Sequence, residues 1–356
     1  MSGPLHPALQ TRFCDLVGCR LPVVQTGMGW VSGANLTAAT SAAGGFGILA
    51  AVTMTPEQLR VAVHGVKERT DAPFGVNFRA DQPDLTERVA FVVREGVRLV
   101  SFAGAPTKEA VARCHDAGVA VMPTVGARRH AEKVLEMGVD AVIAQGGEGG
   151  GHTGSVPTSL LLPQVVDAVG AQIPVLGAGG FFDGRGLVAA LAYGADGIAM
   201  GTRFLLTQES HVPPVVKDRY TAATVFDTVV TTALDGAPQR VIRTEVIDRL
   251  ERSPRLLRLP RAALAALRFR SLTGTSVRDL LLEGAAMRRN QDLTLSQLAM
   301  AANAPMLIKA TMVDGQPEVG ILPTGQVTGV IDELPTVAEL LARIEADAES
   351  TLKGLT

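Results

Sequence analysis

Residues 120–145 read AVMPTVGARRHAEKVLEMGVDAVIAQ. The segment begins with an apolar run at 120–125 and ends with a second apolar run at 141–145. Between them, residues 128–137 have apolar side chains at helical spacing, and Gly138 follows where a left-handed helix cap would stand. Apolar runs that alternate with amphipathic helices are typical of parallel strands covered by helices. This segment therefore predicts one strand–helix–strand unit.

The same unit recurs along residues 21–204. Eight apolar runs end in small or polar residues, at 23–28, 46–51, 74–78, 99–104, 120–125, 141–145, 174–179 and 197–200. Helical patterns lie between them, and several end at a glycine: Gly96, Gly118, Gly138 and Gly194. Eight units of about 20 to 25 residues, without an early Gly-x-Gly-x-x-Gly turn, favour a closed barrel over an open doubly wound sheet. We predict an α/β fold, a (β/α)8 TIM barrel.

The repeat stops after the eighth run. Residues 208–305 look helical and contain twelve arginines from Arg240 to Arg289, with no lysine in that interval. The tail ends in an amphipathic pattern at 336–352. We therefore predict a barrel domain at 1–207, a smaller helical insertion domain at 208–305 that caps the substrate side, and a C-terminal segment at 306–356 that returns to the barrel.

The arginine-rich stretch has two interpretations. Its arginines can form solvated helix faces with nearby acidic residues. Alternatively, they can bind the phosphates of a large substrate or of NAD(H), because the guanidinium fork matches phosphate geometry. The stretch lacks the interleaved aromatic side chains and the motifs of a nucleic-acid site.

Composition limits the partners and the compartment. The 356-residue chain has 47% hydrophobic residues, 19% charged residues and a net charge of −2, so no global field draws it to nucleic acid or to an anionic membrane. No apolar stretch approaches the roughly 20 residues that span a bilayer, and the N-terminus lacks a signal-peptide pattern. Cys14, Cys19 and Cys114 are odd in number and lack metal-clip spacing. We expect a cytoplasmic protein with reduced thiols, no metal and no membrane insertion.

The residues that end each run are candidates for a site, because barrel enzymes work at the carboxyl ends of their strands. A glycine there leaves backbone groups open to a planar ligand, and an amide can pair with both a donor and an acceptor. The candidates are Thr26, Gly27 and Met28 after the first run, Asn77 in the third, Thr124 in the fifth and Gln145 in the sixth. Each can also serve only to satisfy a loop.

Glycine-rich turns follow the seventh and eighth runs, at 177–180 with 183–186 and at 200–203. Barrels commonly hold a phosphate at these neighbouring positions, where backbone N–H groups and a helix N-terminus favour a dianion. The candidates are Gly179, Gly180, Gly201 and Thr202, although glycines there can also serve only to permit tight turns. A phosphate beside planar-ring contacts favours FMN over a nicotinamide dinucleotide as the resident cofactor.

His152 lies in the run 145–154, QGGEGGGHTG. Glycine is costly to order, so this many glycines indicate a backbone pressed against a flat or charged ligand. A neutral imidazole can remove a proton at physiological pH, which hydride transfer to a flavin often requires at the adjacent carbon. The alternative is a histidine that only hydrogen-bonds within its loop. The chain has no Gly-x-Ser-x-Gly motif that would indicate a hydrolase.

These stretches resemble the FMN-dependent nitronate monooxygenase family, which also includes NADH:quinone reductases and a flavin enoyl-ACP reductase. The matching residues are 25–28, 74–77, 149–152, 178–186 and 200–204, in the family's order. The resemblance implies that His152 is the catalytic base. It also implies FMN contacts from Gly27, Met28, Asn77, Thr124, Gln145, Gly150, Gly180, Gly201 and Thr202, and Thr26 and Gly179 belong to the same turns. Some relatives have lysine where Thr124 stands, so a cationic partner for the flavin ring is missing there.

One actinobacterial branch of the family consists of flavin-dependent oxidoreductases that act on an indane-carboxyl-CoA thioester from steroid degradation. The resemblance to this branch is closer, runs nearly end to end and includes residues 23–30, 145–154, 179–186 and 228–232. It implies that His152 removes the proton that the thioester acidifies, that hydride passes to flavin N5, and that NAD(H) is the exchanging co-substrate. The alternatives are a nitronate monooxygenase that uses O2, or an NADH:quinone reductase. A non-enzymatic barrel that binds a phosphorylated ligand is a third, and a homodimer is compatible with each.

Overall fold

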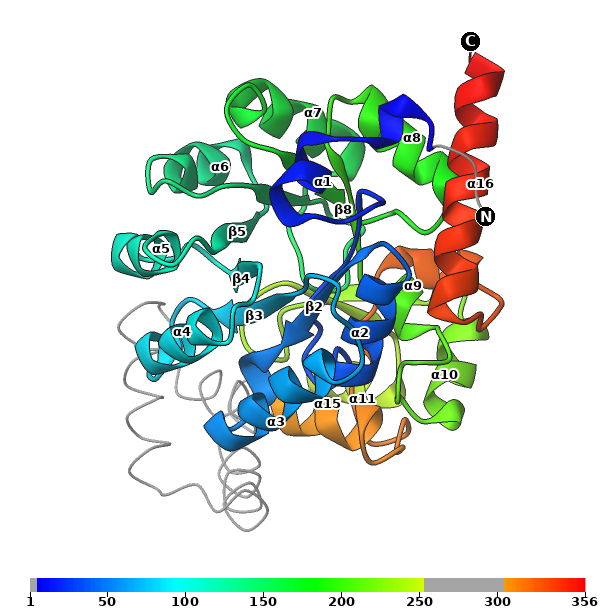
Figure 1. The fold of residues 1–356 in the computed structure, drawn as a ribbon. Coiled ribbons are helices and arrows are strands. Elements are labelled where there is room, and N and C mark those ends of the chain that lie inside the picture. Colours follow the sequence, from blue (N-terminus) through cyan, green and yellow to red (C-terminus); the bar gives the residue numbers. More distant parts are fainter. Residues whose placement is uncertain (1–4, 253–303, 356) are drawn as a thin grey trace.

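Eight parallel strands form a closed barrel in this computed structural model, which describes residues 5–252 and 304–355 (Figure 1). The strands follow one another around the barrel in chain order, and β1 closes it by pairing with β9. The barrel strands are β1 (Val23–Gln25), β2 (Phe46–Ala50), β3 (Gly75–Arg79), β4 (Leu99–Ala103), β5 (Ala120–Val125), β6 (Val142–Gln145), β8 (Val175–Ala178) and β9 (Gly197–Met200). The predicted TIM barrel is confirmed, and each of the eight apolar runs overlaps one strand.

Helices surround the barrel on the outside (Figure 1). They are α2 (Ala34–Ala42), α3 (Pro56–Lys67), α4 (Leu85–Arg94), α5 (Lys108–His115), α6 (Arg128–Leu135), α7 (Thr158–Val169) and α8 (Gly184–Ala192). The four predicted cap glycines, Gly96, Gly118, Gly138 and Gly194, have φ values from +71° to +85°. This left-handed conformation is one that a Cβ atom disfavours, so these helices end where the sequence predicts.

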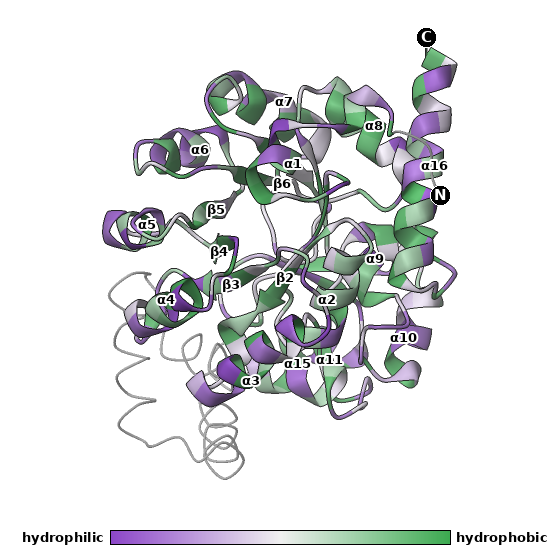
Figure 2. Cartoon of the chain, viewed as in Figure 1, coloured by the Kyte–Doolittle hydropathy of each residue, from purple (hydrophilic) through white to green (hydrophobic). Residues whose placement is uncertain are grey.

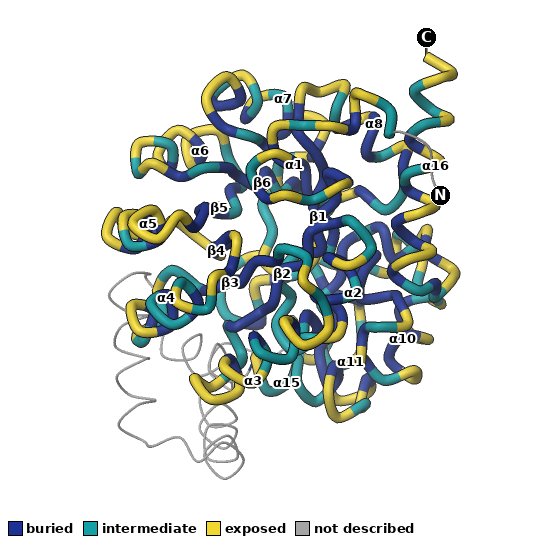
Figure 3. Tube along the Cα trace, viewed as in Figure 1, coloured by how far each residue is buried: buried dark blue, intermediate teal, exposed yellow. Residues whose placement is uncertain are grey.

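The strands are buried on both faces, as their continuous apolar sequences require. Val24, Ile48, Leu99 and Leu176 belong to a cluster inside the barrel, and a larger cluster lies between strands and helices. Figure 3 shows the strands as a dark ring with exposed helix faces outside, and Figure 2 shows polar residues on those outer faces. Burial on both sides of the strands therefore supplies the core.

The short helix α1 (Arg12–Val17) packs at the beginning of the strands. Its Phe13 meets Phe46 edge-on, with ring centroids 6.0 Å apart. The Arg12 guanidinium donates to both carboxylate oxygens of Asp196, at 2.9 and 2.8 Å. Because α1 occupies the amino ends of the strands, the carboxyl ends are the open side of the barrel.

The chain after the barrel is not purely helical, contrary to our expectation for residues 208–305. After the short helix α9 (Thr202–Leu205), the described part of this range contains α10 (Pro214–Thr221), a hairpin of β10 (Thr228–Thr231) and β11 (Gln239–Ile242), and α11 (Glu245–Arg252). Residues 228–231 are all β-branched, which explains why they form a strand. The hairpin continues into a three-stranded sheet, because β11 also pairs with β7 (Gly151–His152). Residues 253–303 of the predicted insertion lie outside the described residues.

The chain then returns to the barrel through α15 (Ala304–Met312), η4 (Gln326–Val330) and α16 (Val337–Leu355). Helix α16 lies beside α8 (Figure 1). The two helices approach so closely that a Cβ atom added at Gly184 would lie 2.3 Å from the carbonyl oxygen of Ile344. The backbone between α15 and α16 passes over the carboxyl ends of the strands, where it reaches the candidate site.

Within the arginine-rich stretch, the arginines that the structure describes make contacts with other groups of the chain. Arg243 contacts Asp248 at 2.7 Å, and Arg249 contacts Glu245 at 2.7 Å along the same helix. The arginines from Arg255 to Arg289 lie outside the described residues. For these described arginines, the pairs fit the solvated-face interpretation. None of the described helices is long and apolar enough to cross a membrane.

Candidate active site

The carboxyl ends of β1, β3 and β9 bring several of the predicted ring contacts together. A Cβ atom added at Gly27 would lie only 2.4 Å from Cβ of Asn77, so the loop after β1 presses against the end of β3. A Cβ atom added at Gly201 would lie 3.4 Å from Oγ1 of Thr26 and 3.3 Å from Sδ of Met28. The loop after β1 therefore lies between β3 on one side and the loop after β9 on the other.

The turns after β8 and β9 offer free backbone donors. Gly179 and Gly180 have φ values of +93° and +83°, which only glycine adopts readily. Within the part of the chain that the structure describes, the backbone N–H groups of Gly180, Gly201 and Thr202 have no hydrogen-bond acceptor. Three unpaired N–H groups on adjacent turns suit an anion, and thus fit the phosphate of the expected FMN.

The second glycine-rich segment after β8 serves a different purpose. The Asp183 carboxylate accepts a hydrogen bond from the N–H of Gly186 at 2.9 Å and caps α8. A negative side chain therefore already occupies the N-terminus of α8. The backbone N–H groups that remain free for an anion are those of Gly180, Gly201 and Thr202, beside the short helix α9.

The returning C-terminal segment completes this side of the site. The N–H of Gly325 donates to Oγ1 of Thr202 at 3.0 Å, and the N–H of Gln326 donates to the carbonyl oxygen of Glu148 at 3.0 Å. A Cβ atom added at Gly150 would lie 2.5 Å from the carbonyl carbon of Thr324. Gly150, a predicted FMN contact, thus directly packs against the segment around Gly325.

His152 lies on β7, at the edge of the added three-stranded sheet. Its side chain is 65% exposed, so the ring faces open space rather than the core. Its Nε2 atom lies 2.7 Å from Oδ2 of Asp235. The Gln239 amide nitrogen lies 2.6 Å from the same oxygen. The predicted base is therefore paired with a carboxylate from the segment after the barrel.

The Asp235 carboxylate is mostly buried, with only 16% of the side chain exposed. Burial raises the pKa of Asp235, but the hydrogen bonds from His152, Ala237 and Gln239 outweigh it and bring the net pKa below the ordinary carboxyl value. The group is consequently ionised at neutral pH and accepts hydrogen bonds only.

The remaining two predicted contacts lie at neighbouring strand ends. The side-chain amide of Gln145 donates to the backbone oxygen of His152 at 2.7 Å, so it holds the histidine loop. Thr124 on β5 is paired in register with Ala103 of β4 and Ile143 of β6, and it is half-buried. Both residues face the barrel's carboxyl end, but Gln145 already has a backbone partner.

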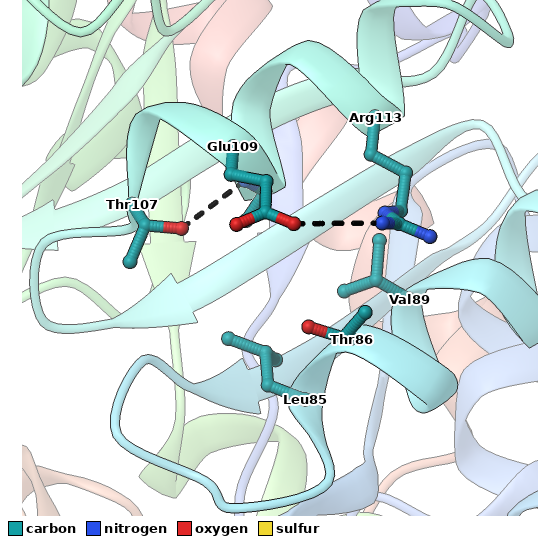
Figure 4. A pocket seen from close by; sticks show the side chains of 7 residues that line it. Leu85, Thr86, Val89, Thr107, Glu109 and Arg113 are labelled. Carbon is teal, nitrogen blue, oxygen red and sulfur yellow. Dashed lines mark hydrogen bonds and ion pairs between the residues drawn. The ribbon is translucent and has the colours of Figure 1, made fainter.

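A small cavity of about 20 Å³ lies elsewhere, between α4 and α5 (Figure 4). It has room for about one water molecule. Its lining consists of Leu85, Thr86, Val89, Thr107, Glu109, Ala110 and Arg113, and includes none of the predicted site residues. The cavity is therefore not the candidate active site.

Our sequence analysis missed Asp235, Gln239 and Gly325. A signal for the first two exists, since Asp235-Gly236 is a turn dipeptide between a β-branched run and a second strand. That signal predicts a hairpin, but not the loop that the hairpin will pair with. No local pattern connects Gly325 with Thr202, which lies 123 residues earlier.

The barrel, its two glycine turns and the loop histidine are now placed, and comparison with known proteins gives the class to which the chain belongs. A family model described as nitronate monooxygenase matches residues 10–90 and 85–347. The chain belongs to this family of oxidoreductases.

Two curated relatives match almost end to end. Both are named (3aS,4S,5R,7aS)-5-hydroxy-7a-methyl-1-oxo-octahydro-1H-indene-4-carboxyl-CoA dehydrogenase. The chain is 54% identical to the protein from Mycobacterium tuberculosis, over 97% of this chain and 98% of the relative. It is 52% identical to the protein from Rhodococcus jostii, over 98% of each. Among solved structures, FabK from Thermotoga maritima is 33% identical with a TM-score of 0.78, over 97% of this chain and 98% of that one.

Proposed function

We propose that this chain is an FMN-dependent, NAD(H)-linked oxidoreductase that acts on a steroid-derived indane-carboxyl-CoA thioester. The observation that carries the proposal is His152, whose exposed ring lies on the loop after β6 and is paired with the Asp235 carboxylate. Identity above 50% along nearly the whole chain to two proteins named as CoA-thioester dehydrogenases supports the substrate class.

The proposed FMN site uses the strand ends described above. Gly180, Gly201 and Thr202 would hold the phosphate through their free N–H groups. The ring would contact Gly27, Met28, Asn77, Thr124 and Gln145, with Thr26, Gly150 and Gly179 completing the turns around it. The tight approach of Gly27 to Asn77 supports this assignment, because a side chain at position 27 would fill the space beside the amide.

His152 would accept a proton in the reaction. Forming a carbon–carbon double bond next to a thioester removes one proton from the α carbon and one hydride from the β carbon. When bound, FMN would take up that hydride, and NAD+ would then reoxidise the reduced flavin. The thioester acidifies the α proton, and a neutral imidazole is a suitable base for it near neutral pH.

The proposal includes the organisation of the chain. Residues 1–207 would bind FMN, residues 208–305 would cover the substrate, and residues 306–356 would return to the barrel. The contact of α16 with α8 and the hydrogen bond from Gly325 to Thr202 support the last assignment. The proposal also includes a homodimer of the chain. Light scattering on the purified protein would test this by comparing its mass with the 37.1 kDa of one chain.

Anaerobic flavin reduction tests the proposed function. The purified protein should show the absorbance bands of a flavin, and these bands should bleach with the CoA thioester or with NADH. Rapid bleaching by an alkyl nitronate alone, with O2 uptake on reoxidation, would favour a nitronate monooxygenase, which the matching family model makes the second candidate. A colourless protein that binds a phosphorylated ligand without turnover would instead indicate a non-enzymatic barrel.

A further inference from the structure

Pairing between strands that are distant in the chain brings Asp235 next to His152. The two residues are separated by 83 positions in the chain. They meet because β11 pairs antiparallel with β7, with Gln239 opposite His152, and because the N–H of Thr153 donates to the carbonyl oxygen of Pro238 at 3.1 Å. The pairing holds the turn that contains Asp235 against the histidine ring.

The carboxylate itself is held by three donors. Its Oδ1 accepts from the N–H of Ala237 at 3.0 Å. Its Oδ2 lies 2.7 Å from Nε2 of His152 and 2.6 Å from the amide nitrogen of Gln239. A carboxylate fixed at both oxygens cannot rotate away, so it presents a fixed acceptor to the imidazole.

This arrangement determines which imidazole nitrogen carries the hydrogen. An ionised carboxylate only accepts hydrogen bonds, so the neutral ring must be protonated at Nε2 to bond with Asp235. The Gln239 amide nitrogen and Nε2 of His152 are 3.2 Å apart, and both then donate to the same oxygen rather than to each other. The lone pair remains at Nδ1, the ring nitrogen that makes no hydrogen bond with Asp235.

We infer that Asp235 is a positioning residue that holds His152 in its Nε2–H tautomer and makes Nδ1 the proton-accepting atom of the site. The inference rests on the proposed role of His152 as base. After the transfer, the carboxylate also stabilises the positive charge of the imidazolium, as in other carboxylate–histidine pairs. The α proton of the substrate leaves as H⁺ to Nδ1, and Asp235 keeps its own charge throughout.

A purely structural role for Asp235 also fits part of the geometry, since its Oδ1 accepts a hydrogen bond from the N–H of Ala237 and closes the turn. A turn residue would affect stability and the order of the hairpin, but not the tautomer of His152. The experiment must therefore distinguish an effect on folding from an effect on the His152 tautomer and on proton transfer.

Asp235→Asn keeps the size of the side chain and removes the charge. The expected result is a fall in kcat of about 10²- to 10⁴-fold with little change in KM or in flavin content, because an amide no longer enforces the tautomer. Asp227→Asn is the matched control: Asp227 also accepts from a backbone N–H and a hydroxyl, both of Thr224, but it does not touch His152. This control should keep the kcat of the wild type.

Two further readouts exclude a merely structural effect. In Asp235→Ala, sodium formate should restore part of kcat, whereas sodium chloride at equal ionic strength should not. The ¹⁵N shifts of the histidine rings, recorded at about pH 8.5 and assigned by comparison with His152→Gln, should show Nε2–H in the wild type and lose that preference in Asp235→Asn. The nuclear magnetic resonance measurement needs no substrate.

Wild-type His152 in the Nδ1–H form would overturn the inference, even if Asp235→Asn fails to fold. So would an Asp235→Asn protein with kcat within about threefold of the wild type, or an Asp235→Ala protein that formate does not reactivate. A wild-type protein with the Nε2–H ring but no turnover of any CoA thioester would contradict the proposed function instead, and leave the hydrogen-bonded pair as assigned.

Discussion

Replacing Gly201 tests the anion site most directly, because asparagine and aspartate have the same size and differ in charge. Position 201 has room for a side chain: the nearest atoms to an added Cβ are the flexible Met28 sulfur at 3.3 Å and the Thr26 hydroxyl at 3.4 Å, and its φ of −104° suits any residue. Gly201→Asn and Gly201→Asp should therefore fold alike.

The charge of the aspartate should make the two variants differ in their affinity for FMN. Two unit charges about 5 Å apart interact by about 3 kcal/mol at an effective dielectric constant of about 20. Since about 1.4 kcal/mol is a factor of ten in affinity, Gly201→Asp should bind FMN about 10²-fold more weakly than Gly201→Asn. Salt screens such a repulsion, so the difference should shrink between low and high ionic strength.

Fluorescence titration of the stripped proteins with FMN gives both dissociation constants. Riboflavin, which lacks the phosphate, is the control ligand and should not distinguish the two variants. Equal FMN affinity for the aspartate and asparagine proteins would refute the assignment of the phosphate to the turns after β8 and β9.

Three other changes test the site and its supports. His152→Ala should keep bound FMN but lose about 10²- to 10⁴-fold in turnover, and full activity would show that another group moves the proton. Gly150→Ala should destabilise the protein by about 1–3 kcal/mol and weaken FMN binding, because its Cβ would meet the Thr324 backbone at 2.5 Å; Gly126→Ala, where the nearest atom is 4.0 Å away, is the control. Arg203→Ala should lower the free energy of unfolding by about 3 kcal/mol in denaturant titrations, since the buried guanidinium donates to two backbone carbonyls; unchanged stability would contradict that role.

Much of the barrel could be predicted from local sequence. Strand and helix positions follow from continuous apolar runs and from glycines that allow a left-handed cap, and both signals depend on neighbours within a few residues. Gly180, Gly201 and Thr202 could be singled out for the same reason, because a barrel places the ends of its last two strands side by side. The helical interpretation of residues 208–305 was wrong at β10 and β11, where β-branched residues in a hairpin outweigh the apparent helical pattern.

The partners of the predicted site residues could not be found this way. His152 was a candidate from its glycine-rich loop, but its pairing with Asp235 depends on the register of β11 against β7. Gln145 stays a predicted ligand contact, and the partner that its sequence position could not reveal is the backbone oxygen of His152. Asp183 stood in a predicted phosphate turn, but it caps α8.

The amino-acid sequence by itself determined the barrel, the turns with free N–H groups and the presence of a histidine among glycines, because period, burial and backbone freedom are properties of short segments. Only the tertiary structure decided which carboxylate pairs with that histidine and which C-terminal segment contacts Thr202. Contacts between residues 83 and 123 positions apart arise from the packing of the whole chain, and no short segment contains the information that sets them.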